Sequence, residues 1–97
     1  MDNRTTDATL EIIGVKVLRT VAGDGWYASV TVRVAQADDR VARGWVHVRP
    51  RGTRLVVDDW DSSDASDIGR FGEVIQTEAD AIVEAVNAKL AVDRRLR

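Results

Sequence analysis

Cysteine is absent from this 97-residue chain, and proline, methionine, phenylalanine and tyrosine each occur once. Without cysteine the chain can form no disulfide, no thiolate nucleophile and no thiolate zinc site, and it is compatible with a reducing compartment. No run approaches the roughly 20 apolar residues needed to cross a bilayer, and the N-terminus lacks a cationic start followed by an apolar stretch. We therefore expect a cytoplasmic protein without membrane contact, in which residues 1–9 form a flexible leader.

The composition is that of a folded domain. Hydrophobic residues make up 44% of the chain and charged residues 31%, a balance typical of globular proteins and not of disordered ones. A chain of this length buries a modest core, so residues 10–97 are expected to form a single domain. The net charge of −2 is unevenly spread, because residues 56–84 hold one arginine against nine acids.

Apolar and polar residues tend to alternate between Leu10 and Trp60, where β-branched residues dominate. This period of two is typical of strands with one buried face. Four strands are predicted, at residues 10–18, 25–35, 41–49 and 54–60. The short connections, including a turn predicted at 49–52 from Pro50 and Gly52, favour antiparallel neighbours and hence a meander.

The last third of the sequence changes to a helical period and is predicted to form one long helix over residues 66–96. At 100° per residue, one stripe of this helix is apolar. The stripe consists of Ile68, Phe71, Ile75, Ala79, Ile82, Val83, Val86 and Leu90. The predicted fold class is therefore α+β, with a four-stranded antiparallel β-meander and one long C-terminal helix packed on one sheet face.

Both faces of the predicted sheet carry side chains that are suited to burial. The face beneath the helix is expected to carry Ile13, Val15, Val17, Ala28, Val30, Val32, Val46, Val48, Leu55 and Val57. The opposite face is expected to carry Leu10, Ile12, Leu18, Tyr27, Trp45, His47 and Val56, among Thr31, Arg33, Arg43 and Arg49. The alternation assigns Trp26 and Trp60 to neither face, because both lie near strand ends.

Residues 58–67, DDWDSSDASD, contain five aspartates and three serines. An EF-hand calcium loop counted from Asp59 requires glycine where Asp64 stands and glutamate where Arg70 stands, so the match fails. A looser cation site and the imitation of a polyanion are the alternatives. The simplest interpretation is local, because Asp and Ser accept backbone hydrogen bonds, end strands and cap helices. We therefore predict no metal site and no cofactor.

Groups suited to catalysis are scarce. His47 is the only histidine, no serine lies in a G-x-S-x-G turn, and no glycine-rich phosphate loop is present. One imidazole could act as a base together with a carboxylate from another strand. A small enzyme with a site around His47 is thus an alternative, while the expectation is a protein that is not an enzyme and has no catalytic residues.

A sheet face that combines aromatic residues with arginines is typical of two kinds of binding surface. Protein interfaces are enriched in Tyr, Trp and Arg, whereas single-stranded nucleic acids stack bases on aromatic rings and place phosphates on arginines. The aromatic content of 5% and the negative net charge disfavour nucleic acid, which is retained as an alternative.

The sequence therefore predicts a protein–protein interaction module. It is either a homodimer or a small adaptor or inhibitor that binds a partner protein. The expected contacts on the open sheet face are Tyr27, Arg43, Trp45, His47 and Arg49. A second, acidic contact segment is expected at Asp58, Asp59, Asp61, Asp64 and Asp67.

Overall fold

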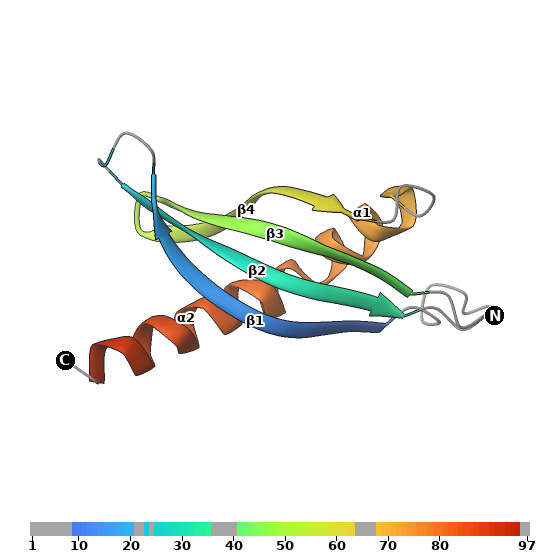
Figure 1. Ribbon diagram of the computed structural model, residues 1–97. Coiled ribbons are helices and arrows are strands. Elements are labelled where there is room, and N and C mark those ends of the chain that lie inside the picture. The colour runs from blue at the N-terminus through green and yellow to red at the C-terminus, as the bar shows by residue number, and fades with distance from the viewer. Residues whose placement is uncertain (1–8, 21–22, 24, 36–40, 64–67, 96–97) are drawn as a thin grey trace.

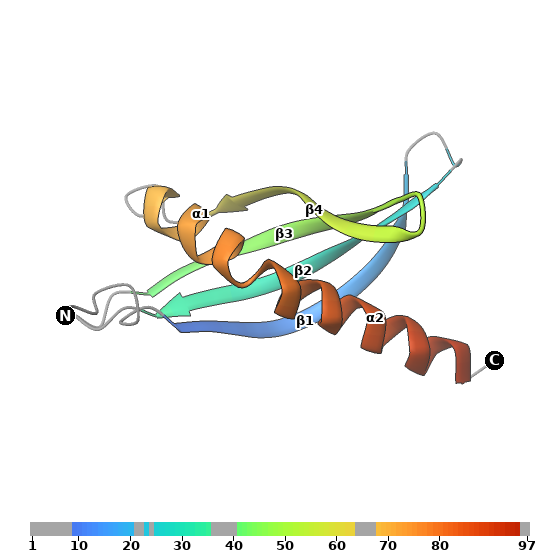
Figure 2. The same ribbon diagram turned by 180° about the vertical axis from the view of Figure 1, so that it is seen from behind.

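A computed structural model describes residues 9–20, 23, 25–35, 41–63 and 68–95 of the chain. One antiparallel sheet has the order β1-β2-β3-β4 and consists of β1 (Thr9–Arg19), β2 (Trp26–Ala35), β3 (Val41–Arg51) and β4 (Arg54–Ser62). Two helices follow, α1 (Ile68–Thr77) and α2 (Ala79–Arg95). Both helices lie across the same face of the sheet (Figure 1), and the C-terminal part of α2 extends past it (Figure 2). The predicted α+β fold class is confirmed.

The core lies between the sheet and the helices, because each contributes one apolar face. α2 packs against β1, β2 and β4, and α1 packs against β4 and β1. The buried side chains are Ala28, Val30, Val32, Val34, Ala42, Val46, Val48, Phe71, Ile75, Ile82 and Val86. The helical members of this set belong to the apolar stripe that the sequence indicated. Trp26 and Trp60, which the alternation assigns to neither face, are half-buried against the same core.

The predicted single helix is interrupted at Glu78. Glu78 N–H donates to the carbonyl oxygen of Val74 at 2.9 Å, and Ile82 N–H donates to the carbonyl oxygen of Glu78 at 3.1 Å. Within the described chain, the amides of Ala79 to Ala81 make no backbone hydrogen bond to α1. They form the first turn of α2, where amides have no intrahelical partner. Among the described residues, no helix is both long and apolar enough to span a membrane.

A bulge in β1 corrects the expected assignment of side chains to the two faces. Ile12 pairs with Val32 and Gly14 pairs with Thr31, so that Ile13 is the extra residue. Because a bulge shifts the alternation by one residue, Leu10 and Ile12 lie on the core side, contrary to expectation. Ile13, expected in the core, is 56% exposed.

The turn between β3 and β4 also differs from the expected one. β3 continues to Arg51, which pairs with Arg54, so the turn consists of Gly52 and Thr53 alone. Gly52 has φ +64°, the left-handed conformation that two-residue hairpin turns require. Pro50 is compatible with a strand here because the pairing of β2 with β3 ends at Val48, and its missing N–H leaves no bond to β2 unmade.

The expected leader, residues 1–9, lies outside the described residues except for Thr9, the first residue of β1.

Candidate functional site on the outer sheet face

The outer face is the side of the sheet that points away from α1 and α2, and no described element covers it (Figure 1). Strand pairing arranges its side chains in rows that cross all four strands. The histidine row consists of Lys16, Ser29, His47 and Asp59, and the tryptophan row of Gly14, Thr31, Trp45 and Asp61. The tyrosine row consists of two strand pairs, Leu18 with Tyr27 and Arg49 with Val56, and the contact between Arg49 and the Tyr27 ring joins the two pairs.

An aromatic cluster of Tyr27, Trp45 and His47 occupies the middle of the outer face. The rings of Trp45 and His47 are stacked, with centroids 4.3 Å apart and planes 24° apart. The rings of Tyr27 and His47 are tilted by 57°, with centroids 4.8 Å apart. All three side chains are half-buried and protrude from the two central strands, so the cluster is a rigid surface.

Arg49 extends the aromatic cluster toward β4. Its guanidinium carbon lies 5.6 Å from the centre of the Tyr27 ring, within the range of a cation–π contact. Its Nε atom lies 2.7 Å from Oδ2 of Asp58. Both partners of this ion pair are exposed to solvent, so it fixes the position of the guanidinium more than it adds stability.

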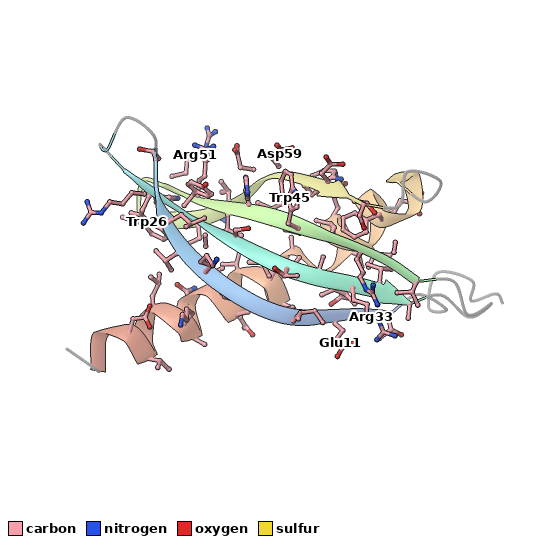
Figure 3. All side chains as sticks on the ribbon, in the orientation of Figure 1. Glu11, Trp26, Arg33, Trp45, Arg51 and Asp59 are labelled. Carbon is pink, nitrogen blue, oxygen red and sulfur yellow. The ribbon has the colours of Figure 1, made fainter. Side chains whose placement is uncertain are left out.

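The outer face is flanked by charged residues at the end where β1 begins. Arg33 donates to Oε1 of Glu11 at 2.8 Å, and the two side chains lie together in Figure 3. Arg43 pairs with Arg33 across the strands and has an exposed side chain, while its carbonyl oxygen accepts hydrogen bonds from Ser62 and Ser63. Arg43 thus belongs to the expected face, at its border and not in the aromatic cluster.

A shallow hollow of about 330 Å³ lies beside the aromatic cluster, over β1 and β2. Its lining consists of Gly14, Val15, Lys16, Leu18, Ser29 and Thr31. The space above Gly14 is open, because a Cβ atom built there meets no atom within 4 Å. Half of the outer face is therefore raised by aromatic rings, and the other half is recessed.

The acidic segment is only partly a loop, because Asp58, Asp59 and Asp61 belong to β4. Oδ1 of Asp59 accepts the N–H of Trp60 at 2.9 Å, and Oδ1 of Asp61 accepts the N–H of Ser62 at 2.8 Å. Such local bonds are what the simplest interpretation of the segment predicted. Asp64 and Asp67 lie outside the described residues.

The histidine row places Ser29, His47 and Asp59 on adjacent strands, the residue types of a hydrolytic triad. A triad requires hydrogen bonds from serine to histidine and from histidine to aspartate. Within the described chain no such bond links these three side chains, and the His47 ring is instead stacked on Trp45. The described residues also contain no group of three His, Asp or Glu side chains that could hold a metal ion.

Sequence reasoning missed the recessed half of the outer face. Lys16 and Gly14 lie far from the aromatic residues in sequence, and only the order of the strands brings them into the same rows. The available signal was the alternation in β1 after the bulge, where Val15 and Val17 on the core side place Gly14 and Lys16 on the outer side.

Comparisons of the chain with protein-family models, with curated proteins and with solved structures found no match.

Proposed function

We propose that this chain is a protein-binding module that acts without catalysis, and that the outer sheet face is its contact surface. The observation that carries the proposal is the aromatic cluster of Tyr27, Trp45 and His47 beside Arg49, on a sheet face that no described element covers. Tyrosine, tryptophan and arginine are the residues that contribute most to binding energy in protein interfaces.

Preorganisation supports the same proposal. The contact side chains protrude from paired strands, and ring stacking and the Asp58 carboxylate hold three of them in place. Less side-chain entropy is lost on binding when side chains are already ordered. The carboxylates of Asp59 and Asp61 border the cluster and provide charge complementarity for a basic partner group.

Single-stranded nucleic acid is the weaker candidate for this face. Aromatic rings and arginines suit bases and phosphates, but Arg33 and Arg49 are each paired with a carboxylate. Asp59 and Asp61 lie opposite His47 and Trp45 on the neighbouring strand and would repel a phosphate backbone. An enzyme site around His47 has no hydrogen-bonded partner group among the described residues.

Photocrosslinking from the face tests the proposal. The photoreactive residue p-benzoylphenylalanine replaces Trp45 in one variant and Glu84, an exposed residue of α2, in the control. Irradiation in the native cells is expected to give a discrete protein adduct from position 45 and none from position 84. The partner identified by mass spectrometry is then purified. Its affinity is expected to fall at least tenfold in Trp45→Ala and to be unchanged in Glu84→Ala, as measured by calorimetry.

Two results would contradict the proposal. One is the absence of any protein adduct at position 45. The other is a partner whose affinity does not change in Trp45→Ala while the variant retains the melting temperature of the parent.

A further inference from the structure

The outer face has complementary groups at its two edges. In the histidine row, Lys16 on β1 is basic and Asp59 on β4 is acidic. In the tyrosine row, both edge residues, Leu18 and Val56, are apolar. The raised aromatic rings lie over β2 and β3, and the hollow lies over β1 and β2. The two halves of the face are thus complementary in charge and in shape.

A two-fold axis parallel to the strands, midway between β2 and β3, brings these complementary groups together. The rotation places β1 of one copy over β4 of the other, and β2 over β3. Each row keeps its position along the strand direction, so it faces the same row of the partner. Lys16 then faces the partner's Asp59, and Leu18 faces the partner's Val56. Because the interface is isologous, each contact occurs twice.

The central strands match in the same arrangement. Arg49 of one copy lies over the partner's Tyr27, which repeats between copies the cation–π contact present within one chain. Trp45 lies over the partner's Thr31, at the rim of the hollow and beside the open space above the partner's Gly14. The same operation brings Arg43 near the partner's Arg33, where Glu11, 2.8 Å from Arg33, offsets the like charge.

We infer that the partner of the outer face is a second copy of this chain, packed face to face about a two-fold axis parallel to the strands, with reciprocal Lys16–Asp59 contacts. This inference rests on the proposed function and specifies its partner. It gives the uncovered sheet face the cover that face-to-face packing of sheets about 10 Å apart supplies in β-sandwiches.

The size of the face limits the area that the dimer can bury. Strands of 9 to 11 residues, at about 3.3 Å per residue and about 4.8 Å per strand, give a face of about 600 Å². Two copies then bury about 1,200 Å², the lower limit for specific interfaces. Because buried area alone does not determine affinity, the dissociation constant is measured over a wide concentration range, from about 0.1 μM to about 1 mM.

Charge reversal tests the arrangement. Lys16→Asp brings a carboxylate against the partner's Asp59, and Asp59→Lys brings two amines together; each change is expected to weaken the dimer at least tenfold. The double variant Lys16→Asp/Asp59→Lys restores opposite charges and is expected to return to within about threefold of the parent. Sedimentation of the purified 10.7 kDa chain over a concentration series measures the dissociation constant.

The recovery of dimer affinity in the double variant cannot come from an interaction between residues 16 and 59 of the same chain. Three strand spacings of about 4.8 Å separate β1 from β4, about 14 Å, which exceeds the screening length of about 8 Å at physiological salt. A matched control reverses Lys89 and Asp93, an ion pair on α2 with a distance of 3.5 Å. Neither the single nor the double variant of that pair is expected to change the dissociation constant.

A second variant separates assembly from folding. Gly14→Gln adds a side chain where the monomer has open space, so the melting temperature of the monomer is expected not to fall. In the dimer this side chain fills the open space beside the partner's Trp45, and the dimer is expected to weaken at least tenfold. A Gly14→Gln chain that dimerises like the parent would overturn the inference.

The outcomes distinguish this inference from the proposed function. A chain that stays monomeric up to about 1 mM, or a double charge reversal that behaves like the single variants, overturns the two-fold arrangement. If position 45 nevertheless crosslinks to a different protein, the proposed function stands with another partner. If position 45 crosslinks to nothing and the chain is monomeric, both are overturned.

Discussion

Gly44 of β3 lies where the sheet packs tightly against Phe71 of α1. A Cβ atom added there would meet the backbone oxygen of Asp61, Cζ of Phe71 at 2.7 Å and Cα of Ser62 at 3.0 Å. Phe71 is 1% exposed, so its ring has no free space into which it can move. At this residue a hydrogen atom in place of a side chain allows the core to close around the aromatic ring.

Gly44→Ala is therefore expected to lower the free energy of unfolding by about 1–3 kcal/mol, as overpacked core substitutions do. Urea denaturation measures the change. Gly14→Ala is the matched control, because its Cβ meets nothing within 4 Å. The control is expected to gain about 0.5–1 kcal/mol, since glycine is unfavourable inside a strand. Equal effects at the two positions would contradict the close approach at Gly44.

At the scale of the element, the bulge in β1 determines which of its side chains face the core. Ile12 packs against the core and Ile13 points away from it, although the uninterrupted alternation assigns them the other way. The reason is that a single extra residue changes the face of every side chain on one side of it.

The bulge predicts opposite effects for two neighbouring residues. Ile12→Ala is expected to destabilise the protein by about 2 kcal/mol, because the position is only partly buried. Ile13→Ala is expected to change stability by less than about 0.5 kcal/mol, as exposed substitutions do. Thermal and urea unfolding of the two variants check this. A regular strand without the bulge would reverse the order.

The break between α1 and α2 gives a second prediction at the same scale. Glu78→Pro removes the N–H that bonds to Val74 and is expected to cost about 3 kcal/mol. Ala79→Pro falls at the first position of α2, where proline is well accommodated, and is expected to cost less than about 1 kcal/mol. If one continuous helix were present, both prolines would cost about the same, and circular dichroism would show a comparable loss of helix.

At the scale of the whole molecule, charge determines which ligands the outer face attracts. The chain has a net charge of −2, and the arginines of the face lie beside Glu11, Asp58, Asp59 and Asp61. Binding to nucleic acid depends on cations that neutralise phosphates and displace counterions. Because the cations here are matched by carboxylates, the field over the face is weak, and it favours a surface that carries both signs.

The chain is therefore expected to bind a fluorescent 20-nucleotide single strand more weakly than about 100 μM at 0.15 M salt, by fluorescence anisotropy. Arg43→Ala should leave this weak binding unchanged. Micromolar binding that falls steeply with salt, and that is lost in Arg43→Ala, would favour the nucleic-acid alternative over a protein partner.

Local sequence pattern is sufficient to predict the four strands, the helical region and most of the core. The alternation of β-branched residues predicts the four strands of the meander, and the helical stripe predicts Phe71, Ile75, Ile82 and Val86 as buried residues. These features follow from local periodicity, because one face of each element must leave water. The placement of Tyr27, Trp45, His47 and Arg49 on one face follows from the same period.

Features that depend on pairing between distant residues emerge only in the folded chain. The bulge at Ile13, the break at Glu78 and the close contact between Gly44 and Phe71 each depend on how the elements pack against one another. Local periodicity does not encode this packing. The same holds for the rows that place Lys16 and Asp59 at opposite edges of the outer face. Strand register fixes which side chains become neighbours, and it is set by the closing of the whole sheet and not by any one strand.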